Sequence, residues 1–138
     1  MANRRHFPYI AVPGTQETAL RPLLSLALEF RGRKHAAYGL LDTGADVNVL
    51  PYTLGLELGC MWEEQPTAVQ LSGNLANYEA RGIILQAIVD AFSPVKLVFA
   101  WTRAENVPLI LGQVNFFLEF DACFFRSRSG FEIGPKGG

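Results

Sequence analysis

The chain has 138 residues and a formal net charge of −1, from 12 Lys and Arg against 13 Asp and Glu. Hydrophobic residues make up 49% and charged residues 18%, which is the composition of a globular domain and excludes a disordered or repetitive chain. This charge balance gives no whole-domain electrostatic basis for binding nucleic acid or a membrane surface. No run reaches the roughly 20 apolar residues of a membrane span, and no apolar run follows the basic residues near the start as in a secretory signal. Two cysteines without metal-type spacing then favour a cytoplasmic protein with no metal or other cofactor.

The first third of the sequence predicts a lead-in segment followed by a β-hairpin. Residues 1–22 are punctuated by Pro and Gly, with a short strand expected between residues 7 and 12. Residues 23–30 alternate apolar and polar side chains, which is the period of a half-buried strand. A polar turn at residues 31–34 and a second strand at residues 35–41 complete the hairpin.

The hairpin ends in the sequence Leu-Leu-Asp-Thr-Gly-Ala-Asp-Val-Asn-Val-Leu-Pro at residues 40–51. An apolar strand runs here into a tight turn and leaves through a second apolar strand. The apolar flanks would partly desolvate Asp42, and Gly44 allows the backbone to close around the carboxylate and point N–H groups at it. These are the requirements of a catalytic acid or base.

The middle of the chain predicts a helical turn and a second hairpin. Residues 52–59 read as a short helical turn or loop, since two glycines argue against a regular helix. Strand-like residues 67–71 and 78–89 flank the small-residue cluster at 72–77, which predicts a hairpin with a flexible tip. Residues 95–101 predict a further strand.

The last third begins with Leu-Ile-Leu-Gly at residues 109–112, a buried strand stopped by a glycine that permits close backbone approach. Residues 113–120 space their apolar side chains as one helical face. Residues 122–125 and 131–133 then predict a C-terminal hairpin, and residues 134–138 a tail.

The order of these features resembles the retropepsins, the aspartic proteases of retroviruses and their cellular and bacterial relatives. Arg21-Pro22-Leu23, the first hairpin, the Asp-Thr-Gly-Ala-Asp turn, a flap-like hairpin, Leu-Ile-Leu-Gly and a helix follow one another over about residues 21–125. The resemblance implies an all-β, single-lobe acid-protease fold: a closed barrel with a flap hairpin and one short C-terminal helix. The protease domain would span residues 21–133.

The resemblance also implies an aspartic endopeptidase acting on peptide or protein substrates. Such catalysis needs two carboxylates that share one proton. This chain has one aspartate followed by Thr/Ser-Gly, so the second carboxylate would be Asp42 of an identical subunit in a homodimer. The implied residues are Asp42, Thr43 and Gly44 for catalysis; Gly44, Ala45, Asp46, Ser72, Gly73, Asn74 and Leu75 for substrate; and Arg21, Thr43 and Asp46 for the dimer.

One position departs from the family pattern. Gln113 stands where the family usually has an arginine that pairs with the aspartate equivalent to Asp46, and Arg21 of the neighbouring subunit is the expected substitute. Two alternatives remain open at this point. The chain could be a non-catalytic retropepsin-like module for dimerisation or peptide binding, or a small β-barrel that binds an unrelated ligand and uses Asp42 as a turn cap.

Overall fold

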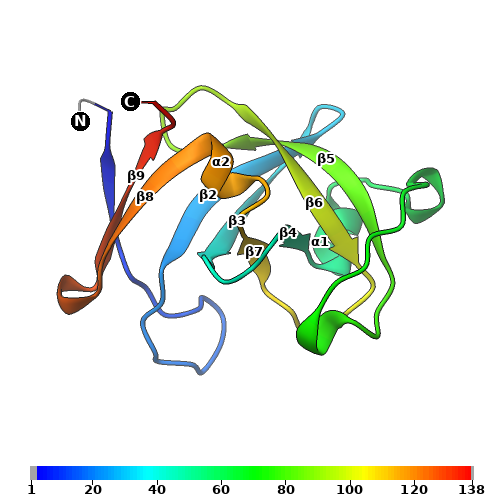
Figure 1. The fold of residues 1–138 in the computed structure, drawn as a ribbon, viewed down its shortest axis with the longest axis horizontal. Coiled ribbons are helices and arrows are strands. Elements are labelled where there is room, and N and C mark those ends of the chain that lie inside the picture. Colours follow the sequence, from blue (N-terminus) through cyan, green and yellow to red (C-terminus); the bar gives the residue numbers. More distant parts are fainter. Residues whose placement is uncertain (1–2, 138) are drawn as a thin grey trace.

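The computed structural model describes residues 3–137, and its main body is a closed six-stranded barrel with strand order β2-β3-β7-β4-β6-β5 (Figure 1). The pairing of β5 with β2, at Ala27 opposite Ile88, closes the barrel. The closed barrel of the all-β fold that the resemblance implied is therefore confirmed, and short helices make the observed fold mostly β. The barrel strands are β2 (Leu23–Phe30), β3 (Arg33–Leu41), β4 (Asn48–Leu50), β5 (Ala80–Ile88), β6 (Val95–Thr102) and β7 (Leu109–Leu111).

The first hairpin forms as its alternating pattern predicts. In β2 the side chains of Leu24, Leu26 and Leu28 are buried in the core, whereas Ser25 between them is exposed. The turn is confined to Arg31 and Gly32, which both have positive φ, so β3 begins two residues earlier than expected. Asp42 directly follows β3, the second strand of this hairpin.

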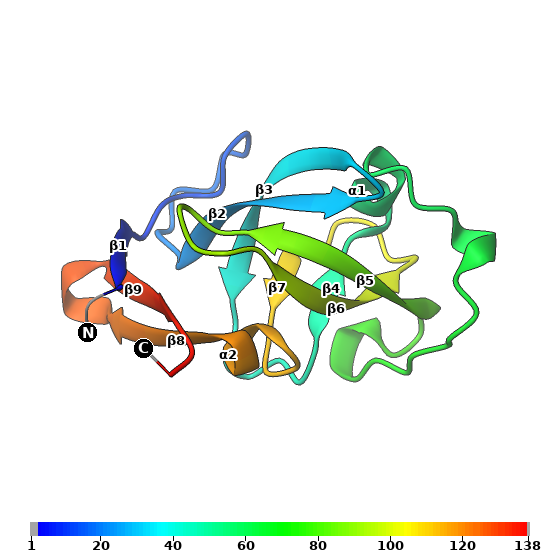
Figure 2. The same cartoon turned by 90° about the horizontal axis from the view of Figure 1, so that it is seen from above.

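A separate three-stranded sheet has the order β1-β9-β8, from β1 (Arg5–Pro8), β8 (Phe120–Phe125) and β9 (Gly130–Pro135). It lies at the opposite end of the long axis from the loop of residues 67–79 in both views (Figures 1 and 2). The strand predicted between residues 7 and 12 instead ends at Pro8. It pairs with β9, with Phe7 opposite Phe131, and Pro8 lies opposite Gly130, the first residue of β9. Beyond it, Ile10 pairs only with Arg21 in an isolated bridge.

The short C-terminal helix is α2 (Phe116–Glu119). A first helix, α1 (Tyr52–Glu57), forms where the sequence predicts a short helical turn or loop. Gly55 does not break α1, because the helix packs there against Trp101, and a Cβ on Gly55 would overlap the indole ring. Three short 3-10 helices complete the described part of the fold: η1 (Trp62–Glu64), η2 (Gly73–Leu75) and η3 (Arg126–Arg128). No helix within residues 3–137 has the length and apolar character needed to cross a membrane.

The flap-like hairpin is less regular than the sequence predicted. Its first arm, residues 67–71, makes one isolated bridge between Ala68 and Arg81 and forms no strand, and the second arm becomes β5 only at Ala80. The tip folds into η2 with Gly73 at φ +63°. The Gln70 side chain donates to two backbone carbonyls in and beside this tip, those of Leu71 and Ala76. These side-chain hydrogen bonds stabilise a compact tip, and the β-ladder between the two arms does not extend to the turn.

Candidate active site

Asp42 directly follows β3, and backbone hydrogen bonds fix its place. Its N–H donates to the Leu111 carbonyl at 3.0 Å, and its carbonyl accepts from the Ala45 N–H at 3.1 Å. The Asp42 Oδ1 atom accepts a hydrogen bond from the Gly44 N–H at 3.0 Å. A Cβ on Gly44 would lie 3.3 Å from that oxygen, so a glycine leaves the carboxylate open on this side. The half-buried carboxylate is thus oriented by the backbone of its own turn.

The segment after β7 locks the loop that follows Asp42. A Cβ on Gly112 would lie 2.6 Å from the Val47 carbonyl oxygen and 2.7 Å from that of Ala45, so only glycine permits this backbone contact. The N–H of Gln113 donates to Ala45 at 2.8 Å, and the N–H of Val114 donates to Asp46 at 2.9 Å. The close approach predicted for the glycine of Leu-Ile-Leu-Gly is confirmed.

A pair of side-chain amides, the buried Asn48 and the partly buried Asn115, ties this loop to the barrel, and no sequence motif predicted it. Asn48 is fully buried; its Oδ1 accepts from the Gly112 N–H at 2.8 Å, and its Nδ2 donates to the Val98 carbonyl and to Asn115 Oδ1. Asn115 in turn bonds the backbone of β6 through Val98 and Lys96. One feature of the sequence could have indicated this contact. Asn48 is a polar residue at an apolar strand, and a buried amide needs hydrogen-bond partners.

Gln113, the departure from the family pattern, supports the turn itself. Its Nε2 donates to the Thr43 carbonyl at 2.8 Å. Thr43 is exposed, and its hydroxyl makes no hydrogen bond to any residue in the range 3–137. Asp46 is exposed as well, and its carboxylate has neither an ion-pair nor a hydrogen-bond partner within the described part of the chain.

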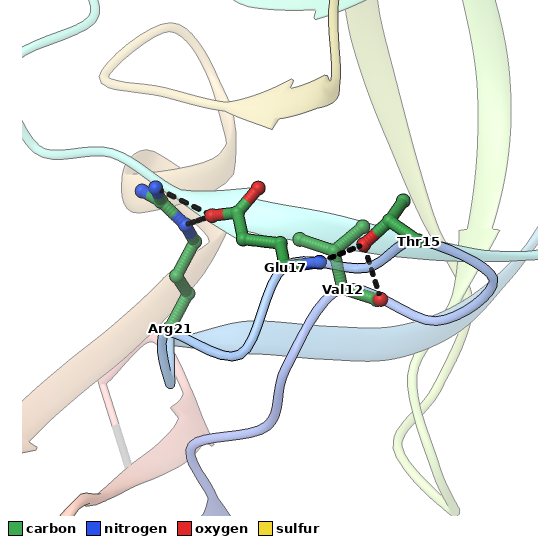
Figure 3. Close-up of polar contacts among 4 residues, drawn as sticks. All are labelled: Val12, Thr15, Glu17 and Arg21. Atoms are coloured by element: carbon green, nitrogen blue, oxygen red, sulfur yellow. Dashed lines mark hydrogen bonds and ion pairs between the residues drawn. The ribbon is translucent and has the colours of Figure 1, made fainter.

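Arg21 is already paired within its own chain (Figure 3). Its Nε and Nη2 atoms both lie 2.7 Å from Glu17 Oε1. Glu17 is held in place because its N–H donates to Thr15 Oγ1, whose hydroxyl donates to the Val12 carbonyl. Both Arg21 contacts go to the same carboxylate oxygen, so an intersubunit contact from Arg21 to Asp46 would either replace the Glu17 ion pair or share the guanidinium with it.

A cleft of about 430 Å³ opens beside Asp42. Two carboxylates, Asp42 and Asp46, contribute to a lining that contains no Lys, Arg or His from residues 3–137. One wall is apolar, because Leu71 and Leu75 of the flap pack in one cluster with Val47. Of the predicted substrate residues, Gly73 alone does not line the cleft. The full lining is Asp42, Gly44, Ala45, Asp46, Val47, Val49, Gln70, Leu71, Ser72, Asn74, Leu75 and Ile110.

This arrangement can present one oriented carboxylate to an extended peptide that lies between the turn and the flap. The apolar wall and the backbone groups of the turn suit a chain that pairs through its main chain and buries alternate side chains. One carboxylate cannot serve as base and as acid in the same step. A reaction that needs an acid and a base in one step would therefore need a second group beside Asp42.

Comparison with solved structures identifies the fold. A retropepsin-like aspartic protease from Rickettsia conorii superposes with a TM-score of 0.60 at 11% sequence identity, over 93% of this chain and 98% of that one. The protease of EIAV, solved in complex with the inhibitor HBY-793, matches with a TM-score of 0.49 at 20% identity, over 75% of this chain and 88% of that one. No protein-family model matches the sequence. No curated protein sequence matches it either.

Proposed function

We propose that this chain, which has the fold of retropepsin-like aspartic proteases, is an aspartic endopeptidase that works as a homodimer. The observation that carries the proposal is the Asp42 carboxylate, held by the Gly44 N–H at the mouth of a cleft that lies under a flap. A similar fold does not by itself imply the same chemistry, so the proposal depends on the residues that line the cleft.

The reaction would run through two Asp42 carboxylates that share one proton. The ionised carboxylate takes a proton from a water molecule as the water oxygen attacks the scissile carbonyl carbon, and the protonated carboxyl donates its proton to the carbonyl oxygen. A neutral tetrahedral diol results. Transfer of a proton from the dyad to the amide nitrogen then accompanies cleavage of the C–N bond, and the diol returns its hydroxyl proton to the dyad.

The dimer follows from the chain's single catalytic turn. Asp46, Asp90 and Asp121 lack the Thr/Ser-Gly that follows Asp42, so the chain has no second turn of this kind. The exposed Thr43 would meet its counterpart on the two-fold axis. In the terminal sheet β9 pairs with a strand on each side, so only β1 and β8 are edge strands among the described residues. Pro8 of β1 has no N–H to donate to a further strand, whereas the outer edge of β8 is unpaired. We therefore place the intersubunit sheet contact on β8, at residues 122–125.

The test is cleavage of a mixed peptide library by the purified protein, between acid and neutral pH, beside Asp42→Asn. The amide keeps the shape of the side chain and loses the proton-sharing carboxylate, so cleavage should disappear while the melting temperature stays close to that of the wild type. Activity should peak in the acid to mildly acid range, where one proton sits on the dyad.

Two outcomes would contradict the proposal in different ways. An equal rate for Asp42→Asn and wild type would assign the cleavage to another group. Peptide binding by both proteins without cleavage would favour the alternative, a non-catalytic module for peptide binding or dimerisation.

A further inference from the structure

We infer that Gln113 is a positioning residue of the active site, which acts on Asp42 through one peptide unit. Its side-chain amide holds the peptide between Thr43 and Gly44 in the orientation that points the Gly44 N–H at the Asp42 carboxylate. The inference rests on the proposed function, because it gives that N–H a part in the reaction of Asp42. All the contacts that carry it lie within a single chain.

The peptide unit between Thr43 and Gly44 makes one hydrogen bond at each end. Its carbonyl oxygen accepts from Gln113 Nε2 at 2.8 Å, and its N–H donates to Asp42 Oδ1 at 3.0 Å. This peptide is trans, so its C=O and N–H groups point in opposite directions and the two bonds form one continuous chain. A rotation of the peptide that breaks one bond therefore breaks the other.

The geometry of the turn shows why this peptide needs support. Residues 42–45 form a β-turn in which the Ala45 N–H donates to the Asp42 carbonyl at 3.1 Å, and the peptide between Thr43 and Gly44 is its central unit. The central peptide is the unit that reverses between type I and type II turns, and type II needs a positive φ at its third residue, which glycine adopts at no steric cost. Gly44 does not have a positive φ here. Reversal would keep the ends of the turn in place and point the Gly44 N–H away from Asp42.

Gln113 opposes this reversal. No other donor within residues 3–137 bonds the Thr43 carbonyl, and Thr43 and Gly44 are both exposed, so packing does not hold the peptide. The backbone of Gln113 is itself fixed, because its N–H donates to the Ala45 carbonyl at 2.8 Å. Its amide also polarises the peptide, which strengthens the Gly44 N–H as a donor, and it adds no charge beside Asp42.

The test of catalysis is Gln113→Met, which keeps a side chain of similar length and removes the donor. For a peptide that the protein cleaves, kcat should fall about twofold to tenfold, the effect of one exposed neutral hydrogen bond, while KM changes by less than about twofold. Gln113→Ala should give the same result, because the loss of the donor is the cause and not the shape of Met. All rates are measured at a temperature where every variant is folded.

Gln65→Met is the matched control. It also removes an amide that donates to a backbone carbonyl, that of Met61 at 3.4 Å, and it lies outside the lining of the cleft. It should keep the wild-type kcat.

The Gly44 amide gives a second readout that does not need cleavage. In ¹H–¹⁵N NMR spectra of Gln113→Met, this amide should exchange with solvent about twofold to tenfold faster than in the wild type, and its proton resonance should move upfield, because its bond to Asp42 weakens. The Gly112 amide, which donates to Asn48 Oδ1 at 2.8 Å, should exchange as in the wild type. Gln65→Met should leave both amides unchanged.

The two readouts separate this inference from the proposed hydrolysis. A Gly44 amide that is the same in wild type and Gln113→Met would overturn the inference, whatever the activity. An altered Gly44 amide with an unchanged kcat would overturn it as well, since the N–H would then have no part in the reaction. If the wild type cleaves nothing while the Gly44 amide still depends on Gln113, the proposed hydrolysis fails and the positioning of the Asp42 turn by Gln113 is supported.

Discussion

Gly112→Ala should damage the active site through a collision between backbone and side chain. The new Cβ would lie 2.6 Å from the Val47 carbonyl oxygen and 2.7 Å from the Ala45 carbonyl oxygen. Ordinary carbon–oxygen contacts begin at about 3.4 Å, so the overlap is roughly 0.7 Å with each of two oxygens. Both oxygens belong to the loop after Asp42 and cannot rotate away as a flexible side chain could. Either β7 or the loop must move.

The cost follows from this overlap. Overpacking of a close-packed site costs about 1–3 kcal/mol, and two backbone contacts place Gly112→Ala in the upper half of that range. For a chain of this size, about 2–3 kcal/mol lowers the melting temperature by roughly 6–15 °C. Displacement of the Ala45 carbonyl also shifts the Asp42 turn, and a misplacement of about 1 Å reduces kcat/KM by about a hundredfold.

Gly82→Ala is the matched control. A Cβ there would meet Val69 Cγ2 at 3.7 Å and Thr67 at 3.9 Å, which are ordinary contacts. Its free energy of unfolding should stay within about 1 kcal/mol of the wild type. Thermal unfolding and peptide cleavage are measured for both variants, with cleavage taken at a temperature where both are folded. A Gly112→Ala protein that melts and cleaves like Gly82→Ala would refute the close-packed contact as the support of the turn.

Three further outcomes follow from the structure. Gly55→Ala should lower the melting temperature although Ala favours helices, because its Cβ overlaps Trp101, and a shifted tryptophan fluorescence spectrum should accompany the loss. Asn48→Ala should cost about 1–3 kcal/mol in chemical denaturation, because it leaves the buried Gly112 N–H without its acceptor. Burial raises the pKa of the Cys60 thiol to about 11, so at pH 8 alkylation followed by mass spectrometry should label the partly exposed Cys123 first. Because the raised pKa belongs to the folded state, the contribution of Cys60 to stability is complete below about pH 9 and declines as the pH rises towards 11.

Local sequence patterns predicted the elements that depend on local chemistry. The alternation at residues 23–30 gave β2 its buried face, and Leu-Ile-Leu-Gly predicted β7 together with the close contact at Gly112. The Asp-Thr-Gly turn likewise predicted that a backbone N–H would face the Asp42 carboxylate. Each of these features is set by a few neighbouring residues.

The features that the sequence did not reveal depend on partners far along the chain. The two glycines of residues 52–59 left open whether this segment is a helical turn or a loop. The helix α1 forms because it packs at Gly55 against Trp101, which lies 46 positions later in the chain. The end of β1 is set by its register with β9 at the other terminus. The hydrogen bond between Asn48 and Asn115 joins positions 67 residues apart, and the sequence around neither residue predicts the other as its partner. Propensity and spacing do not reach over such distances.

The central claim is that two chains share one catalytic dyad, and a mixing experiment tests it most directly. Wild type and Asp42→Asn are combined in varying proportions at constant total chain concentration, above the dissociation constant found by sedimentation, and allowed to exchange subunits. If both Asp42 carboxylates are needed, activity should fall with the square of the wild-type fraction, so an equal mixture keeps about one quarter of it. An equal mixture that keeps about one half would mean that each chain works alone, and it would contradict the shared dyad.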